Sequence, residues 1–579
     1  MLPLLIAIIQ AAATLQGTVR AEGSREPIAW ATVEVVGTER RVAADVRGLF
    51  TMTGIPAGTH RIRVTAPGYR PGEVDATVPA AGTLRLDLEL QPQPIEIAGI
   101  EVETEAVERA AGAVGPPPAR LDSAIVRLIP GLAEADVLRA LQVLPSVQQA
   151  SDYSSALYIR GGSPDQTLIT LDGAPLFNPY HLGGIFAAID PDATAALDVW
   201  PGAAPAAVGD RLSGAVHIWT REGGRDRLRT RGSVGLVSSR ASLDGPIRGG
   251  RGSFLLSARR TYLDLFTQAM KAIGLIDRGL PYHFADAHLK VVHDLGTLGR
   301  VSGSLYYDEE QLKNRDPLDL GDPRFDDDFD WGSRAAALDW RQPLGGRFLL
   351  EARAAFSAFR SGIDFFEQED FGGPIGEPVG EPVQTMRGRA YMRDALAAAT
   401  LTTYLRSHEL SAGLQLDAYR LEYDVDTADD DFFADILPEF ERSDRLTTLA
   451  AFVEDEWEAL PSLRLRGGAR VLAADGDAAL LPRFGLAWAA SDRLTLTLGG
   501  GRYAQALHSF RNEESILASF LAYDLLAPGD SAGFAMSEDI VLGGEWRDAA
   551  TRVRVDVYAR RFRDVPVPPL PADPLEARL

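Results

Sequence analysis

Histidines and carboxylates are the side chains of this 579-residue chain whose types and spacing could support metal binding. His283, His288 and His293 recur every five residues. In a strand an odd spacing alternates between the two faces, so neighbouring members of this series cannot converge on one ion. Two runs of aspartate, at 326–328 and 429–431, lack the glycine that an EF-hand calcium loop needs at its sixth position. We therefore expect solvated acidic loops in these places rather than a calcium or cationic-ligand site.

The sequence gives no more support for covalent catalysis, cofactor binding or nucleic-acid binding. The chain has no cysteine, which excludes a disulfide framework, a thiolate metal site and a cysteine nucleophile. It contains no Walker loop, no nucleophile elbow and no zinc-ligand spacing, and no carboxylate pair stands apart from ordinary loop acids. The formal charge of −23 leaves no basic stripe for nucleic-acid phosphates. We expect no catalytic residue, no bound metal and no cofactor.

The elements that must position any binding residues are best defined in the stretch 156–220. Three short apolar runs, at 157–159, 168–171 and 216–219, are separated by Arg-Gly-Gly, Asp-Gly and Gly-Asp turn signals. Runs of this length between such turns predict strands of a small mixed domain. Upstream, residues 132–144 place apolar side chains at helical spacing between prolines and predict a helix with its apolar face inward.

Two of these turns contain charged residues. Arg160, Gly161 and Gly162 form the first turn, and Asp172 and Gly173 form the second. We interpret Arg160 and Asp172 as turn-fixing residues, through an ion pair or a bond from side chain to backbone, because Asp-Gly and Gly-Gly pairs are common in loops of every kind. Neither residue is a candidate for catalysis.

Four motifs in this stretch together resemble the plug domain of TonB-dependent outer-membrane receptors. They read I-R-G-G at 159–162, L-I-T-L-D-G at 168–173, I-D-P-D-A at 189–193 and G-A-V-H-I-W-T at 214–220. Each motif alone is weak, but their order within one short segment makes the resemblance specific. The chain departs from the pattern at 208–211, where many members have Tyr-Gly. The resemblance implies a small α+β plug over residues 121–222.

The residues before this plug divide into three parts. Residues 1–13, MLPLLIAIIQAAA, combine a short apolar core with small residues and predict a signal peptide, with a buried first strand as the alternative. From 15 to 92, apolar and polar residues alternate between turn signals, which predicts a β-sandwich. Its G-x-V, P-I-x-x-A-x-V, G-x-F and G-Y-R pieces resemble the carboxypeptidase regulatory-like domain. We interpret this domain as a periplasmic spacer or protein-contact module.

Residues 93–120 are predicted to be a linker with a β-prone run at 95–104. An exposed run of this kind can pair with the edge of a partner's sheet, where backbone bonds give affinity. In TonB-dependent receptors a short TonB box precedes the plug and binds TonB in this way. The resemblance therefore implies a candidate box made of Ile100, Glu101, Val102, Glu103 and Thr104. The last strand of the preceding sandwich is an equal alternative for these residues.

From residue 223 onward, long segments with strict alternation predict an antiparallel transmembrane β-barrel. In segments such as 410–418 and 494–498 one face is mostly apolar and the other mostly polar. The best of these run for about ten residues, the length that crosses a bilayer as a tilted strand. Short links alternate with long connections, as outer-membrane barrels require. The short links lie at 248–251, 295–299, 345–346, 407–408, 461–462, 492 and 549–550.

Counting hairpins gives about fourteen strands, whereas plugged outer-membrane transporters close with about 22. The last strand-like run gives way to a proline-rich stretch at 566–571, and the chain ends at Leu579 without an aromatic-terminated strand. We therefore expect the barrel at 223–579 to be partial, lacking about eight strands, which is the difference between the two counts.

The expected fold class is mainly β, with an N-terminal β-sandwich, a small α+β plug and an incomplete antiparallel barrel. The resemblance implies an outer-membrane receptor, with front domain and plug facing the periplasm, that imports a scarce, bulky substrate driven by TonB. Its expected partners are a TonB-type energy-coupling protein, an unknown small-molecule or oligomeric ligand, and outer-membrane lipid. The alternative is a non-transporting binding or adhesion protein, for which residues 100–104 would be dispensable.

Overall fold

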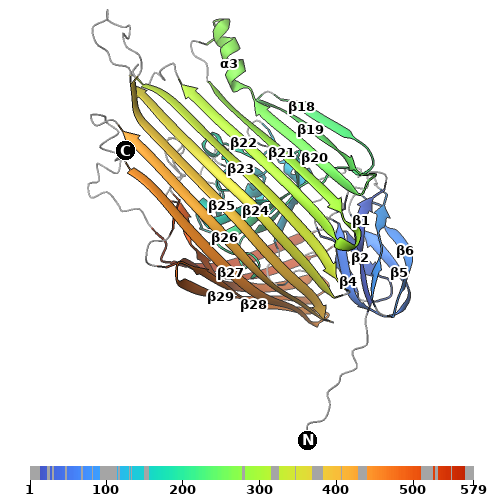
Figure 1. Cartoon of the computed structure of the whole chain (residues 1–579). Helices are drawn as coiled ribbons and strands as arrows, with labels where there is room; N and C mark the ends of the chain where they lie inside the picture. The colour runs from blue at the N-terminus through green and yellow to red at the C-terminus, as the bar shows by residue number, and fades with distance from the viewer. Residues whose placement is uncertain are drawn as a thin grey trace, which may run out of the picture.

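A computed structural model gives the fold (Figure 1). It describes residues 13–91, 114 and 118–566, apart from 23–26, 29–30, 39, 46–47, 67–68, 81, 130, 132–133, 149–154, 236, 277–280, 315–324, 346, 368–382, 406, 428–439, 510–525, 529–532 and 549–550. The candidate TonB box at 100–104, the aspartates at 429–431 and residues 1–12 of the predicted signal peptide lie outside the described residues.

The front domain is a β-sandwich of two four-stranded sheets. One sheet has the order β4-β1-β7 with β8 also paired to β1, and the other has the order β3-β2-β5-β6. Leu15, Val33 and Ile62 are fully buried between the sheets, as the alternation of apolar residues predicts. The strands are β1 (Ala13–Ala21), β2 (Thr32–Val35), β3 (Arg41–Ala43), β4 (Leu49–Ile55), β5 (Gly58–Thr65), β6 (Gly72–Val78), β7 (Thr83–Arg85) and β8 (Leu88–Leu90).

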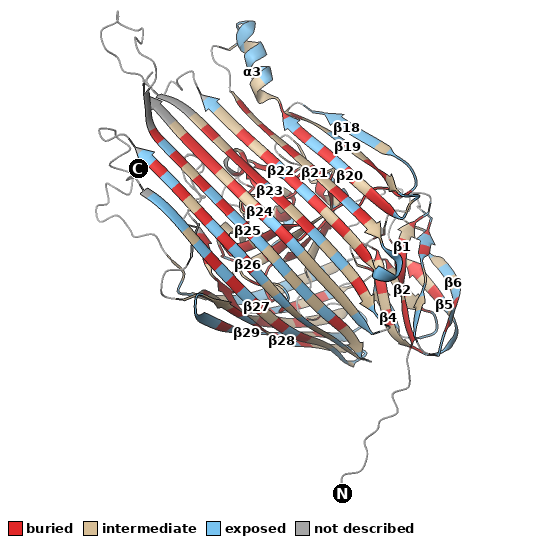
Figure 2. Ribbon diagram, viewed as in Figure 1, coloured by how far each residue is buried: buried red, intermediate tan, exposed pale blue. Residues whose placement is uncertain are grey.

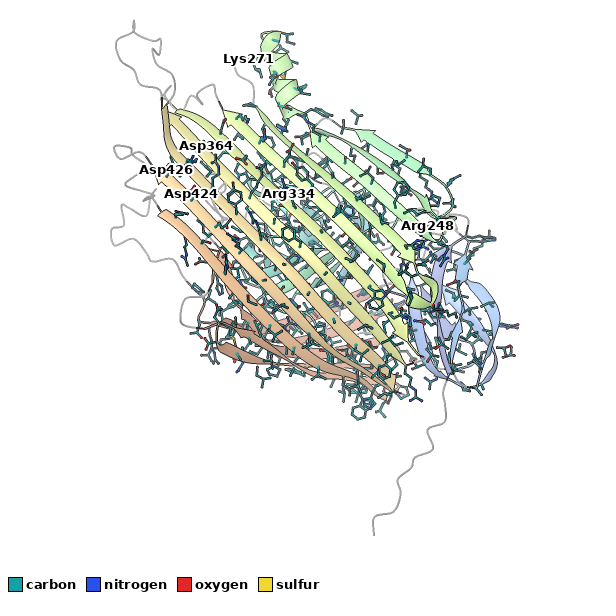
Figure 3. The ribbon with its side chains drawn as sticks, viewed as in Figure 1. Arg248, Lys271, Arg334, Asp364, Asp424 and Asp426 are labelled. Atoms are coloured by element: carbon teal, nitrogen blue, oxygen red, sulfur yellow. The ribbon has the colours of Figure 1, made fainter. Side chains whose placement is uncertain are left out.

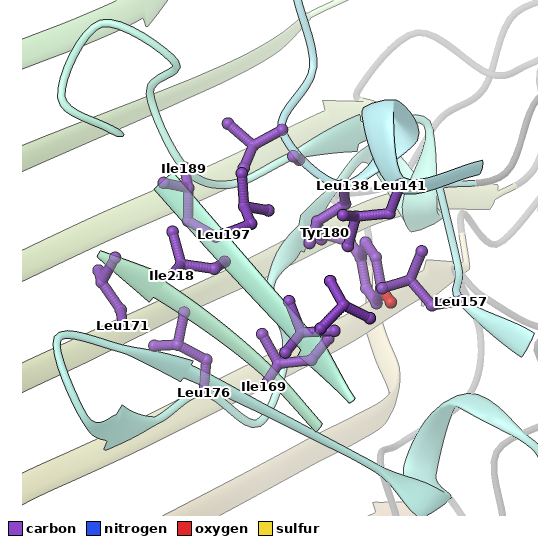
Figure 4. Packing of buried hydrophobic residues seen from close by; sticks show 14 of the residues in the cluster. Leu138, Leu141, Leu157, Ile169, Leu171, Leu176, Tyr180, Ile189, Leu197 and Ile218 are labelled. Carbon is purple, nitrogen blue, oxygen red and sulfur yellow. The ribbon is translucent and has the colours of Figure 1, made fainter. Parts of the chain in front are cut away.

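The plug is built around a five-stranded sheet of order β13-β12-β17-β16-β9, in which β12 and β17 run parallel. Leu171, Leu197 and Ile218 from this sheet pack with Leu138 and Leu141 in one apolar core (Figure 4). Its strands are β9 (Ala119–Asp122), β10 (Val147–Gln148), β11 (Tyr158–Ile159), β12 (Thr167–Leu171), β13 (Ala174–Pro175), β14 (Tyr180–His181), β15 (Phe186–Ala187), β16 (Thr194–Trp200) and β17 (Gly214–Thr220). Its helical turns are α2 (Ser123–Leu128), η1 (Arg139–Val143), η2 (Pro164–Gln166) and η3 (Leu182–Gly184).

The prediction of a helix at 132–144 was wrong, because the residues described in this segment form the 3₁₀ turn η1 and no α-helix. The Asp136 carboxylate accepts hydrogen bonds from the backbone N–H of Arg139 and of Ala187, each at 2.7 Å. These bonds tie the segment to β15, and an aspartate that binds backbone groups in this way competes with the helical ladder. The apolar side chains of the segment still point inward, since Leu138 and Leu141 are fully buried.

The barrel wall is one antiparallel sheet of fifteen strands in chain order, with β18 and β34 as its two edges. Its strands are β18 (Arg229–Val234), β19 (Ser238–Ile247), β20 (Gly252–Thr261), β21 (Tyr282–Asp294), β22 (Arg300–Asn314), β23 (Phe325–Leu344), β24 (Phe348–Glu367), β25 (Val383–Leu405), β26 (His408–Thr427), β27 (Phe440–Leu460), β28 (Leu463–Ala474), β29 (Asp477–Ser491), β30 (Leu494–Gln505), β33 (Ala535–Arg547) and β34 (Arg552–Arg563). Buried and exposed residues alternate along these strands (Figure 2). The strand that hairpin counting missed is β18, which follows the plug directly.

The predicted short links fall between consecutive strands and define one end of the wall, here named the short-turn end. The opposite, long-loop end bears α3 (Leu263–Ala272) and the small hairpin of β31 (Leu507–Ser509) and β32 (Leu526–Pro528). Figure 3 shows Arg248 at the short-turn end and Lys271, on α3, beyond the long-loop end. None of the helices among the described residues is long and apolar enough to cross a membrane.

Five strands of the wall, β23 to β27, have 20 to 23 residues each and are about twice as long as the predicted segments. The aspartates at 326–328 therefore belong to β23, and the prediction of a loop there was wrong. Asp328 pairs with Lys313 on one side and with Asp364 on the other. Pairing with strands on both sides satisfies the backbone N–H and C=O groups of this segment. An interpretation that assigns a run of acidic residues to a loop does not anticipate such pairing.

The front domain lies against the short-turn end of the wall (Figure 1). Arg20 pairs with Asp294 at 3.4 Å, and Arg341 pairs with both Asp45 and Glu351. Asp294 also binds Arg225, which lies between the plug and β18. These contacts join the front domain, the end of the plug and the barrel rim at one place.

Candidate functional site

The plug meets the barrel wall through charged side chains, and two of them lie at the predicted turns. Arg160 and Gly161 have φ of 47° and 78° and join Ile159 to Gly162 in a tight turn. Paired positive φ values are typical of the type I′ turn. A Cβ at Gly162 would lie 2.3 Å from Ser213 Oγ, so this position has no room for a side chain. The turn therefore brings the Arg160 side chain to the wall.

Side chains of β34, an edge strand of the wall, bind this turn. Arg160 is 4% exposed and lies 3.5 Å from an oxygen of Asp556. Arg560 donates from Nη1 to the carbonyl of Ile159 at 3.2 Å and to Ser213 Oγ at 2.9 Å. Its Nη2 donates to the Ser213 carbonyl at 2.8 Å and pairs with Asp539 at 3.1 Å. One guanidinium thus satisfies backbone and side-chain acceptors of the plug, which a planar fork of donors suits.

The second turn binds the wall more directly. Asp172 and Gly173 have φ of 49° and 90° and connect β12 with β13. The Asp172 carboxylate accepts from Thr220 N–H at 3.0 Å, from the Thr220 hydroxyl and from Lys290 Nζ at 2.8 Å, and His288 Nε2 lies 3.5 Å away. Burial alone would raise the pKa of Asp172, but Lys290 and His288 outweigh it and hold this pKa well below its usual range. Asp172 is therefore a carboxylate that joins two plug strands to β21.

A third contact joins β14 of the plug to β21 and β22. His181 is 1% exposed, and its Nδ1 lies 3.2 Å from a Glu310 oxygen. Its Nε2 lies 3.9 Å from Asp286, and its ring stacks on Phe284 with centroids 4.0 Å apart. Burial lowers the pKa of His181, but the nearby carboxylates of Asp286 and Glu310 outweigh it and raise this pKa to about 9. The protonated His181 faces Glu310 most closely, since Asp286 also pairs with Arg259 at 2.7 Å.

This contact predicts a pH-dependent stability. A histidine whose folded pKa is raised to about 9 from 6.5 stabilises the fold fully below pH 6.5 and loses that contribution as the pH rises through 9. The contribution is on the order of 3 kcal/mol. We expect the thermal unfolding midpoint of the wild type in detergent to fall from pH 6.5 to pH 9.5 and that of His181→Gln to fall much less. The matched control is His60→Gln in the front domain, which should keep the wild-type profile. Parallel profiles for wild type and His181→Gln would contradict this role.

The sequence identified the plug turns but missed the wall residues that hold them. Lys290, Glu310 and Arg560 are inward-facing polar residues of alternating strands, and alternation could have marked them as lumenal. Further contacts of this kind hold residues 201–212: Glu454 accepts from Ala206 N–H at 2.7 Å and Arg470 pairs with Asp210 at 2.9 Å. The three histidines of β21 do not converge, since only His288 belongs to the inward set. No group of residues suited to a metal ion occurs in the part of the chain that the structure describes.

Toward the long-loop end, the inner face of β23 to β27 is apolar and aromatic. The buried cluster there contains Phe329, Trp331, Phe359, Ile363, Met386, Met392, Tyr419, Leu421, Tyr423, Val425 and Leu446. The rings of Phe329 and Trp331 stack with centroids 5.7 Å apart. Leu507 of β31 belongs to the same cluster, and Phe177 of the plug packs against it. This wall could bury apolar or aromatic groups above the plug.

Three family descriptions match successive parts of the chain. Residues 14–91 match the carboxypeptidase regulatory-like domain, residues 128–216 match the TonB-dependent receptor plug domain, and residues 277–571 match the TonB-dependent receptor-like β-barrel. The barrel description alone covers about half of the chain. No curated protein matches the chain.

Solved structures with the same fold include three siderophore receptors. The siderophore receptor PirA from Acinetobacter baumannii is 15% identical with a TM-score of 0.55, and 80% of this chain and 72% of that one are covered. A mutant of the ferric enterobactin receptor PfeA from Pseudomonas aeruginosa is 15% identical with a TM-score of 0.53, covering 78% and 71%. The ferric yersiniabactin uptake receptor FyuA from Yersinia pestis is 13% identical with a TM-score of 0.53, covering 79% and 74%. At such identities the likeness shows the fold alone. Together with the barrel, plug and front-domain matches, it places this chain in the family of TonB-dependent receptors.

Proposed function

We propose that this protein is an outer-membrane receptor that imports a scarce, bulky substrate, and that TonB drives the import by binding residues 100–104. The observation that carries the proposal is the polar contact between plug and wall. Asp172 with Lys290, His181 with Glu310, and Arg560 with the Arg160 turn hold a domain that has its own apolar core. A plug with its own core inside a wide barrel is suited to sealing the lumen until it is moved.

The chemistry of this interface favours displacement. Breaking an apolar interface exposes hydrophobic area to water, at a cost of roughly 25 cal/mol for each Å². Hydrogen bonds exchange instead for bonds to water, so an ordinary one contributes only about 0.5–1.5 kcal/mol net and one to a charged group about 1.5–3 kcal/mol. The wall residues Tyr306, Ala335 and Ala337 do join the plug's apolar cluster, so displacement still requires work. The chain has no Walker loop with which to use a nucleotide. In this proposal the work of displacing the plug comes from an external source, TonB.

The placement of the parts agrees with this mechanism. The front domain and the short turns lie at one end of the wall, which the proposal assigns to the periplasm, and the long connections lie at the other. The candidate box lies in the segment between the front domain and β9, the first strand of the plug. A ligand that enters from the long-loop end meets the apolar wall of β23 to β27 above the plug. The names of the structural neighbours make ferric siderophores the first ligand class to test.

A crosslinking experiment tests the coupling without knowledge of the ligand. Because the chain has no cysteine, Val102→Cys introduces a single reactive site in the candidate box, and Ala113→Cys provides a matched site in the same linker. We expect Val102→Cys to form a disulfide with a cysteine-substituted periplasmic domain of TonB, and Ala113→Cys to do so much less. Equal crosslinking at both sites would refute the assignment of the box. Crosslinking at neither site would favour the second candidate, a non-transporting binding or adhesion protein.

A further inference from the structure

The outer face of the wall changes character at the same relative place on five neighbouring strands. On β23, for example, Leu338 is 54% exposed and Trp340 is 36% exposed, and the next outward residue beyond Ala336 toward the long-loop end is Arg334. On β24, β25 and β26 an outward stretch of about ten residues, apolar except for Thr403, likewise precedes the arginine. On β27 the apolar outward residues are Leu449, Ala451 and Val453, with Thr447 between them and Arg445 and with Asp455 on the short-turn side. The five arginines, here named the arginine row, are Arg334, Arg360, Arg393, Arg420 and Arg445, from β23 to β27 in turn.

The apolar stretch between the short turns and the arginine row has the features of a lipid-facing band. Outward tryptophans lie close to the short turns, where barrels place aromatic girdles at the membrane interface. These are Trp340, Trp457, Trp488 and Trp546, between 36% and 46% exposed. Between the tryptophans and the arginine row, side chains such as Leu414, Leu449 and Val453 are more than half exposed. The arginine row therefore lies at the other boundary of the band, toward the long loops.

Beyond this boundary the arginine row comes first, followed by a layer of aspartates that also contains Arg387 and Arg389 of β25. Asp330 and Asp364 lie four residues beyond the arginines of their own strands, and Asp424 lies four residues beyond Arg420. Figure 3 shows Asp364, Asp424 and Asp426 closer to the long-loop end than Arg334. Some pairs form between the layers, such as Arg360 with Asp330 at 3.4 Å. Ion pairs between the two layers would form equally well with arginine and aspartate exchanged. Pairing alone therefore does not explain why the arginines lie nearest to the apolar band.

A hollow on the same outer face lies beside the row. It has a volume of about 560 Å³ and is lined by Ala241, Ala258, Ala285, Ala287, Arg260 and Tyr307. The alanines come from three neighbouring strands, and their small side chains leave an apolar trough. Arg260 is the first outward charged residue beyond the apolar stretch of β20. The Arg334 guanidinium lies over the Tyr307 ring, 5.7 Å from its centroid, which connects the hollow to the row.

From this layering we infer that the arginine row binds the phosphate groups of lipids in the outer leaflet, with acyl chains lying along the apolar band and in the alanine hollow. Arginine suits this role because its fork of donors matches phosphate oxygens and its stem can lie along apolar surface while the guanidinium reaches the headgroups. The inference goes beyond import and rests on the outer-membrane placement in the proposed function. Phosphate in solution has no acyl chains, so the band and the hollow distinguish a lipid from a free anion.

Binding to two defined glycolipids tests the inference. The full-length protein is reconstituted in phosphatidylcholine vesicles that contain either a diphosphorylated lipid A or the same glycolipid without phosphates, and bound glycolipid is titrated. The test variant is Arg334→Gln/Arg393→Gln/Arg445→Gln, which leaves the Arg360–Asp330 and Arg420–Glu422 pairs intact and removes only the 3.9 Å contact of Arg393 with Glu422 among the ion pairs of the described residues. The matched control is Arg40→Gln/Arg41→Gln/Arg70→Gln, which removes the same charge from exposed positions of the front domain.

We expect the preference of the wild type and the control for the phosphorylated glycolipid to exceed that of the test variant by on the order of 100-fold, since each of the three arginines removed contributes about 1 kcal/mol near a charged surface. The test variant should lose most of this preference, and inorganic phosphate should not compete. Equal preference in wild type and test variant, or full competition by inorganic phosphate, would overturn the inference. Crosslinking of Val102→Cys to TonB reports on the proposed function separately, because the box is remote from the arginine row in the sequence.

Discussion

A protein that lacks residues 95–104 should still bind its ligand at the cell surface but should no longer import it. In the proposed orientation the ligand reaches the long-loop end from outside, whereas the deleted segment precedes β9 in the sequence. The deletion removes the backbone groups with which the candidate box would extend a sheet of TonB. We expect uptake of a bound ferric siderophore to fall to the level of cells without TonB, measured beside surface binding on the same cells.

A point substitution separates strand pairing from simple shortening of the linker. Val102→Pro removes a backbone donor and cannot take part in a strand ladder, whereas Val102→Ala keeps the backbone unchanged. We expect Val102→Pro to match the deletion and Val102→Ala to retain most of the uptake. Uptake that survives both the deletion and the proline would refute energy coupling through this segment. Loss of surface binding in the deletion would show that the segment serves folding instead.

The second large effect is expected at Asp172. Asp172→Asn leaves Lys290 Nζ buried without its carboxylate, and removing one partner of a buried ion pair typically costs about 3–5 kcal/mol. We expect a lower thermal unfolding midpoint and faster proteolysis of the plug than in the wild type. The matched control is Thr220→Val, which removes only one hydroxyl donor to the same carboxylate and should cost about 1 kcal/mol.

Combining substitutions isolates the ion pair from the turn. In Asp172→Asn/Lys290→Met neither charge remains, so no unpaired charge is buried and part of the lost stability should return. The coupling energy of this double-mutant cycle measures the contact between plug and wall. If the double variant is less stable than Asp172→Asn by the full effect of Lys290→Met, the two residues do not interact and the tie between β12 and β21 is refuted.

Local patterns in the sequence predicted most of the elements and few of the contacts between them. The strands around 168–171 and 216–219 and the turn at Asp172 were predictable, because a two-residue Asp-Gly turn and a short apolar run depend on neighbours in the chain. The same holds for the front sandwich and for the junctions at the short-turn end. The helix at 132–144 failed because Asp136 binds Ala187, which is 51 residues away. Helical spacing within the segment contains no sign of that partner.

For the candidate site, too, the sequence predicts local features but not the contacts between distant residues. Alternation marks Lys290 and Glu310 as inward-facing, but it does not say that they meet Asp172 and His181, which lie 118 and 129 residues earlier. Strand length was underestimated for a related reason. Beyond the apolar band of β26, the inward face becomes apolar at Tyr419 and Leu421, while the outward face becomes charged at Arg420 and Glu422. A prediction that follows one continuous apolar face ends the strand where the apolar and polar faces exchange. The backbone hydrogen bonds between strands continue beyond that point, so the strand is longer than predicted.

The position of β9 has a mechanical consequence. β9 is the edge strand of the plug sheet, pairs only with β16 there, and is held to it by Arg120 and Asp198 at 2.7 Å. A pull on the preceding segment loads this strand first, because the front domain that lies upstream is anchored to the barrel rim through Arg341 and Asp45. The next sheet strand along the chain, β12, lies on the far side of β16 and β17. We therefore expect β9 to detach from the edge of the plug sheet first, while the central strands and the contact of Asp172 with Lys290 remain in place.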